Sequence, residues 1–275
     1  MSYKDILLYL DDGASNPQRV ATGLRLAGRH QARITGVSLS ASIPRHLKVK
    51  DAKTRAGLAR EAAEKRAAEF EQAAAEAGVE ASSLVIDGDV SEAAKRLAQC
   101  ARNYDLALLR QANPKSRNLE LMEKVAEQAI LLGGRPILFM PYIGAHRSPC
   151  QRAFIAWDGT PAATRAVHDA IPLLKNIPDV VLLVVQEGKP KTRRGELLCE
   201  GMSEHLGRHG ISVRSLRTHT GSFDVPTVIL NQIAENDADL LVMGGYGTPS
   251  LKQKIFGGVT RTILSSMIVP VFMSH

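Results

Sequence analysis

The chain carries the same pattern twice. Each half ends with an Asp-led apolar strand, an intervening segment, and a short strand that begins with proline at its second position. The two pairs of strands are Asp105–Leu109 with Arg135–Met140, and Asp239–Met243 with Val269–Met273. Both pairs share one offset, since 239 − 105 and 269 − 135 each give 134, so the segments can be compared position by position. A repeat of this length predicts two folded units, which we place at 1–143 and 150–275.

Composition narrows the class of protein. Aromatic residues make up only 4% of the chain, so the two cores must be built from aliphatic side chains, as in helix-covered parallel sheets. The net charge of +7 is divided between the halves, with 21 basic and 17 acidic residues in 1–143 and 14 and 11 in the rest. That distribution argues against a nucleic-acid-binding face. No apolar run reaches the roughly 18 residues that span a bilayer, and there is no signal-peptide pattern. Three isolated cysteines favour reduced thiols, so we expect a cytoplasmic protein with no membrane or nucleic-acid partner: Cys100, Cys150 and Cys199.

Apolar runs and helical patterns alternate regularly along both halves. In the first half we expect strands at 6–10, 34–38, 83–86, 105–109 and 136–140, a loop at 39–50, and helices at 16–30, 51–77, 90–102 and 118–132. In the second we expect strands at 152–157, 179–185, 211–217, 239–243 and 269–273, and helices at 161–174, 191–209, 224–236 and 258–267. This order predicts the α/β class, with two tandem domains that each contain a five-stranded parallel, Rossmann-like sheet. Ligands of such sheets bind beyond the carboxyl ends of the strands.

The two copies differ at four glycines. The second copy has Gly244, Gly247, Gly257 and Gly258 where the first has Arg110, Asn113, Glu123 and Lys124. Glycines at a strand exit and a helix start leave backbone N–H groups open to a phosphate, and Thr260 could add a hydroxyl donor. The alternative interpretation is that these glycines form only a turn and the start of a helix, with no ligand. Because the first copy folds without these glycines, we interpret them as one phosphate site, in the second copy only. Nearby Lys252, Lys254 and Arg261 are interpreted as a solvated helix face.

Asp158 follows the first strand of the second half. A carboxylate there can accept hydrogen bonds from a base amino group or a ribose hydroxyl. It can also form an Asx turn that caps the next helix, and one side chain can do both. Asp11 is its counterpart in the first half, where no glycine cradle accompanies it.

These residues resemble a known nucleotide-binding motif. The spacing G-x2-G-x9-G after a strand that ends in Met243, together with Asp158-Gly159-Thr160, is similar to the motif of the universal stress protein family. The resemblance implies an adenine nucleotide alpha hydrolase-like fold that binds ATP, with or without Mg²⁺. It places the adenine–ribose end at Asp158 and Val185. The phosphate end would lie along Met243, Gly244, Gly247, Gly257, Gly258, Val259 and Thr260.

The chain departs from that motif at one informative position. Gly258 stands where the family has Ser or Thr, so one phosphate hydrogen bond, of order 1 kcal/mol, is missing and weaker binding is expected. This leaves a second interpretation open, a protein-interaction module of the same fold that binds no nucleotide.

We expect no catalytic residues. There is no P-loop, no nucleophile elbow and no identifiable general base, so a slow ATPase is the least favoured interpretation. His205 and His209 could pair on a metal, but they are interpreted as a polar helix face. The resemblance implies a stress-related regulatory role, with protein partners or a homodimer possible. It also suggests that strands 136–140 and 269–273 pair to form a pseudo-dimer.

Overall fold

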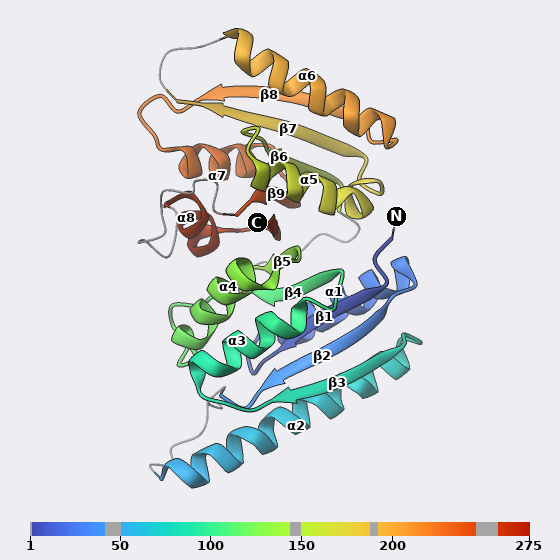
Figure 1. Ribbon diagram of the computed structural model, residues 1–275, viewed down its shortest axis with the longest axis vertical. Helices are drawn as coiled ribbons and strands as arrows, with labels where there is room; N and C mark the ends of the chain where they lie inside the picture. Colours follow the sequence, from blue (N-terminus) through green and yellow to red (C-terminus); the bar gives the residue numbers. More distant parts are fainter. Residues whose placement is uncertain (1, 42–50, 144–149, 188–191, 246–257) are drawn as a thin grey trace. The chain divides into compact units, whose positions relative to one another are not determined.

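The structure is a computed structural model that describes residues 2–41, 51–143, 150–187, 192–245 and 258–275. The chain divides into two compact units, Ser2–Ile143 and Gly144–His275, each with its own sheet and helices (Figure 1).

The N-terminal unit is a five-stranded parallel sheet in the order β3-β2-β1-β4-β5. Its elements are β1 (Asp5–Leu10), α1 (Asn16–His30), β2 (Arg33–Leu39), α2 (Ala52–Glu76), β3 (Ala81–Ile86), α3 (Val90–Ala101), β4 (Leu106–Arg110), α4 (Leu119–Gly133) and β5 (Ile137–Met140).

The C-terminal unit repeats this topology, with strand order β10-β9-β6-β7-β8, all parallel. Its elements are β6 (Arg152–Ala156), α5 (Pro161–Leu174), β7 (Asp179–Gln186), α6 (Thr192–Arg208), β8 (Val213–His219), α7 (Val225–Glu235), β9 (Leu240–Gly244), α8 (Gly258–Ser266) and β10 (Val271–Ser274).

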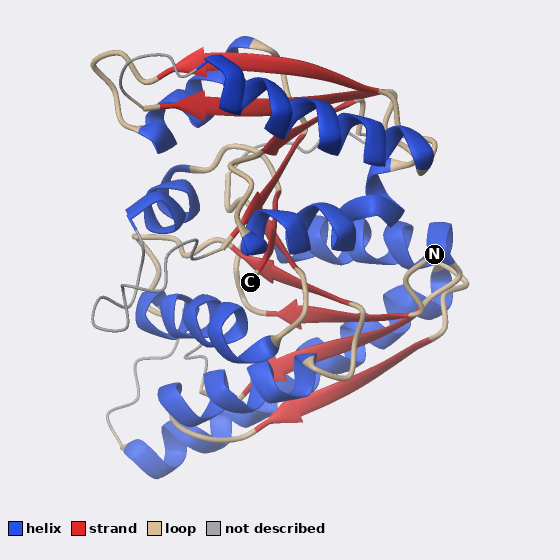
Figure 2. Ribbon diagram, turned by 45° about the horizontal axis from the view of Figure 1, so that its top comes forward, coloured by secondary structure: helices blue, strands red, loops and turns tan. Residues whose placement is uncertain are grey.

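Helices cover both faces of each sheet (Figure 2). In the N-terminal unit α1 and α2 share one face, because Gly23 of α1 faces Leu8 while Phe70 of α2 lies against Gly36, the register partner of Leu8. The predicted class of two tandem Rossmann-like domains with parallel sheets is therefore confirmed. The central strands β1, β4, β6 and β9 are buried along most of their length, since both of their faces are covered.

Most expected elements agree with the structure to within one or two residues. The predicted strand at 211–217 begins two residues later, because Gly210, at φ 80°, and Ile211 close the end of α6: the Ile211 N–H bonds the carbonyl of Leu206. The loop predicted from 39 also begins later, since β2 includes Leu39. Residues 42–50 of that loop lie outside the described residues.

Helix starts follow a repeated capping rule. Four Asp or Thr side chains accept a hydrogen bond from the backbone N–H three residues on, which satisfies an otherwise unpaired donor: Asp51, Asp89, Thr160 and Asp224. None of the helices in the described ranges combines the length and the apolar character that crossing a membrane requires.

Candidate functional site

The predicted site lies where the strand order of the C-terminal sheet reverses. Ala156 of β6 and Met243 of β9 are register partners, so the carboxyl ends of the two strands lie side by side. Asp158 follows β6 by two residues and Gly244 is the last residue of β9. Val185 is half-buried near the carboxyl end of β7, on the other side of β6. The fold therefore brings these predicted site residues to one edge of the sheet.

Asp158 forms the capping turn of α5. Its Oδ1 accepts hydrogen bonds from the backbone N–H of Thr160 at 3.0 Å and from the Thr160 hydroxyl at 2.7 Å. The Thr160 Oγ1 in turn accepts the N–H of Ala163 at 3.2 Å, and Gly159 makes the turn at φ 76°. Asp158 is exposed, and within the described ranges its Oδ2 makes no hydrogen bond. The Asx turn thus uses only one of the two carboxylate oxygens.

Gly244 is required by packing. A Cβ at this position would lie 2.5 Å from the backbone N of Ala163 and 2.7 Å from the carbonyl carbon of Ala162, at the start of α5. Those are backbone atoms, so the contact could be relieved only by moving the helix. The prediction that the fold does not itself need a glycine at this position is wrong for the C-terminal unit. Gly244 alone is therefore no sign of a ligand.

The start of α8 is open by contrast. Gly258 is exposed, and a Cβ built on it would meet no atom of the described residues within 4 Å. Val259 is also exposed, whereas Thr260 is buried. The predicted residues Gly247 and Gly257, with Lys252 and Lys254, lie outside the described residues.

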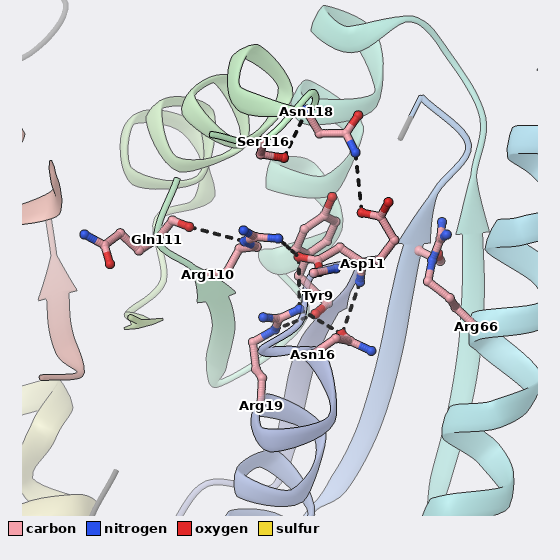
Figure 3. A network of polar contacts seen from close by, with 12 residues as sticks. Tyr9, Asp11, Asn16, Arg19, Arg66, Arg110, Gln111, Ser116 and Asn118 are labelled. Carbon is pink, nitrogen blue, oxygen red and sulfur yellow. Dashed lines mark hydrogen bonds and ion pairs between the residues drawn. The ribbon is translucent and has the colours of Figure 1, made fainter. Parts of the chain in front are cut away.

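In the N-terminal unit the matching corner is filled by an ion-pair network (Figure 3). The position equivalent to Gly244 is Arg110, whose Nη1 donates to Asp11 Oδ2 at 3.0 Å. Arg19 Nη2 lies 3.0 Å from the same oxygen, and the N–H of Gly13 donates to Asp11 Oδ1 at 2.6 Å. The side chain of Asp11 has no exposure at all, and those of both arginines are at most 3% exposed. The carboxylate of Asp11, which corresponds to that of Asp158, is here paired with two arginines of the same unit.

The charged groups of this network shift the pKa values of their neighbours. Burial by itself would raise the pKa of Asp11, but Arg19 and Arg110 outweigh it and hold that pKa below its usual value. Burial, followed by the charge of Asp11, raises the pKa of Tyr9 above its ordinary value, so the phenol stays neutral. Asp11 is therefore a permanently charged internal partner for two arginines at physiological pH.

A longer turn makes room for Arg110. Four residues separate Asp11 from the start of α1 at Asn16, whereas two separate Asp158 from the start of α5 at Pro161. The guanidinium occupies the space beside this longer turn, since a Cβ on Gly13 would lie 2.3 Å from Arg110 Nη1. The earlier start of α5 closes the same space in the C-terminal unit and explains why only glycine fits at 244.

Arg19 was not predicted as part of this arrangement, and Arg110 was noted only as a replacement for glycine. The signal was present in the sequence. An Arg and an Asp stand at the ends of two strands that a doubly wound sheet places side by side, and opposite charges there are expected to pair.

Comparisons with known proteins agree with this architecture. A sequence model described as the universal stress protein family matches residues 150–275. No curated protein matches the sequence.

Several solved structures match the fold. A universal stress protein from Archaeoglobus fulgidus DSM 4304 matches at 21% identity with a TM-score of 0.76, covering 98% of this chain and 95% of that one. A putative universal stress protein from Pseudomonas aeruginosa UCBPP-PA14 matches at 13% identity with a TM-score of 0.66, covering 99% and 93%. A universal stress protein family protein from Arabidopsis thaliana, solved with AMP bound, matches at 16% identity with a TM-score of 0.34, covering 44% and 88%.

The fold and the strand-end edge thus define a tandem α/β protein of the doubly wound, Rossmann-like class. The C-terminal unit matches the sequence model of the universal stress protein family, and the N-terminal unit repeats the same fold.

Proposed function

We propose that the C-terminal unit binds an adenine nucleotide, with ATP and Mg²⁺ as the first ligand to test, and that the N-terminal unit does not. The observation that carries the proposal is the contrast between two equivalent carboxylates. Asp158 is exposed and keeps one oxygen outside its capping turn, whereas Asp11 is buried and paired with two arginines. A ligand that needs this carboxylate could reach it in only one unit.

The start of α8 supports the phosphate end of the proposal. A helix N-terminus carries unpaired N–H groups and the positive end of the helix dipole, which favour an anion. The open space around the Cα of Gly258 would let phosphate oxygens approach the backbone. The predicted contacts at Met243, Val185, Val259 and Thr260 remain proposals.

The role that follows is regulatory, with nucleotide occupancy rather than turnover as the signal. Incubation of the complete chain with ATP and Mg²⁺, followed by phosphate release over time, tests this part. Release at the rate of an established ATPase would contradict it.

Calorimetric titration of the complete chain with ATP and Mg²⁺ tests the binding proposal. We expect one nucleotide per chain and loss of binding in Gly258→Glu. A carboxylate at the start of α8 repels phosphate and offsets the positive charge of the helix N-terminus. The matched control is Gly207→Glu on α6, where an added Cβ also meets nothing within 4 Å. Two nucleotides per chain, or equal affinity in both variants, would refute the proposal.

Two observations favour a second candidate, a protein-interaction module without nucleotide. Gly258 lacks the hydroxyl of the family motif, and Gly244 is accounted for by packing against α5. No heat of binding with ATP, ADP or AMP, in a chain that remains folded, would favour this candidate.

A further inference from the structure

Three histidines from two helices lie in contact on the C-terminal unit. The ring centres of His168, on α5, and His205, on α6, are 4.7 Å apart. Those of His205 and His209, one turn further along α6, are 4.8 Å apart. The sequence shows only the pair on α6, and the fold supplies the third ring. The cluster is separate from the strand-end edge described above.

The hydrogen bond of His168 decides which of its ring nitrogens is available to a cation. His168 Nδ1 lies 2.8 Å from the carbonyl oxygen of Thr164, one turn earlier on α5. Because a carbonyl only accepts, Nδ1 must carry the hydrogen, which leaves the lone pair of a neutral ring on Nε2. A backbone carbonyl that fixes the other ring nitrogen is the usual support of a metal-binding histidine.

His205 supplies a ring nitrogen without a hydrogen-bond partner, within the described residues, at the centre of the cluster. Its Nε2 is buried and makes no hydrogen bond in the described part of the chain. A buried polar atom without a partner is costly, so such an atom in a native fold calls for an explanation.

We propose that His168, His205 and His209 together bind one divalent transition-metal ion of the zinc class. Imidazole nitrogens suit Zn²⁺, Ni²⁺ and Cu²⁺, whereas Mg²⁺ and Ca²⁺ prefer oxygen ligands. Three protein ligands leave a fourth position for water. The proposal is independent of nucleotide binding.

The ring spacings come close to those of a metal site. With metal–nitrogen bonds of about 2.1 Å, two imidazoles on one tetrahedral ion have their ring centres roughly 5.2 Å apart. The two measured spacings, 4.7 and 4.8 Å, are slightly shorter, so the rings are in contact and must separate a little around an ion. As the side chains stand, no three such groups in the described ranges converge to hold a metal. The three rings must therefore shift to share one ion, with His168 keeping its bond to Thr164. The exposed His168 and the half-exposed His209 leave room for this shift.

Titration of the complete, untagged chain with Zn²⁺, and with Co²⁺ as a spectroscopic probe, tests the site. We expect one Zn²⁺ per chain, a Co²⁺ spectrum of low coordination number, and a rise in melting temperature with Zn²⁺ but not with Mg²⁺. His168→Ala and His209→Ala should each weaken binding by at least about tenfold, since each removes one of three ligands. His219→Ala, an exposed histidine on β8, is the matched control and should bind as the parent does.

The outcomes separate the alternatives. No Zn²⁺ uptake at micromolar concentrations overturns the proposal. Uptake that survives both His168→Ala and His209→Ala places the metal elsewhere, for example on a cysteine, and also overturns it. Loss in His209→Ala alone reduces the site to the pair on α6 and refutes the three-ligand assignment. Circular dichroism checks that each alanine variant, placed on a helix surface, remains folded.

Discussion

Arg110 and Asp11 stand 99 positions apart in the chain, yet Arg110 Nη1 donates to Asp11 Oδ2 at 3.0 Å with both side chains buried. The pair occupies the corner of the N-terminal unit that corresponds to the proposed nucleotide site of the C-terminal unit. An internal guanidinium thus stands where a ligand would otherwise approach.

Arg110→Ala should destabilise the N-terminal unit. It removes one of two arginines from a buried carboxylate, and we expect a loss of about 1–3 kcal/mol, because Arg19 still partly compensates the charge. Urea unfolding of the complete chain measures this loss. Arg60→Ala on α2, which breaks only exposed ion pairs with Glu64 and Asp87, is the control and should have a much smaller effect. Equal effects would show that the buried pair contributes no more than a surface one.

The contribution of Asp11 to stability should depend on pH. Its pKa in the folded chain lies below the ordinary value of 3.8, so folding favours the ionised form. The resulting stability is present above that ordinary value and is lost as the pH falls through the lower, folded-state pKa. The difference in unfolding free energy between the parent and Asp11→Asn should therefore shrink on acidification below about pH 4. A difference that stays constant would argue against an ionised Asp11 in the fold.

Gly244→Ala separates a packing role from a ligand role. The added methyl group would meet backbone atoms of α5, and we expect a loss of about 1–3 kcal/mol without any nucleotide present. Gly258→Ala, where the space is open, should change stability by less than about 1 kcal/mol. Thermal or urea unfolding of the two variants gives the comparison. A neutral Gly244→Ala would mean that α5 can move away easily.

Gly258→Ser should tighten nucleotide binding. It restores the hydroxyl expected from the family motif, and one added hydrogen bond of about 1 kcal/mol corresponds to roughly a fivefold gain in affinity. Calorimetry with ATP and Mg²⁺ measures the gain, with Gly207→Ser on α6 as the control. If affinity falls, the helix start does not face the phosphates.

Asp239→Ala should lower the stability of the C-terminal unit, because Asp239 holds the backbone at the beginning of β6. Asp239 Oδ2 accepts the backbone N–H groups of Gln151 and Arg152 at 2.7 and 3.0 Å. Asp105 does the same for Lys4 and Asp5 in the other unit. Loss of both bonds should cost about 1–3 kcal/mol, measured by urea unfolding. Asp239→Asn, which keeps an acceptor oxygen, should recover part of the loss, and an unchanged alanine variant would contradict the role.

The sequence predicted the fold well because its signals are local. The limits of α1 and α5 agree with the predictions to the residue, since polar or proline-led starts and apolar periodicity define both. The repeat itself supplied the two units. It also located the two Asp residues before β4 and β9, although their hydrogen bonds to the first strands could only be seen in the folded chain.

The packing details could not be predicted in the same way. The steric need for Gly244 depends on how closely α5 approaches β9, and that distance follows from a turn two residues shorter than its counterpart. His168 joins His205 only because α5 and α6 are neighbours in space. Such relations between distant segments leave no mark in the local sequence pattern.

The short turn into α5 also limits how the two halves can diverge. A single nucleotide change can turn many glycine codons into arginine codons. At position 244, however, an arginine side chain would collide with the start of α5. In the N-terminal unit α1 begins two residues later in the matching turn, which leaves space for Arg110. Pairing Asp158 with an arginine at position 244, as Asp11 is paired with Arg110, would require both that substitution and a longer turn before α5. The halves are therefore not interchangeable, since the main chain of α5 excludes any side chain from position 244.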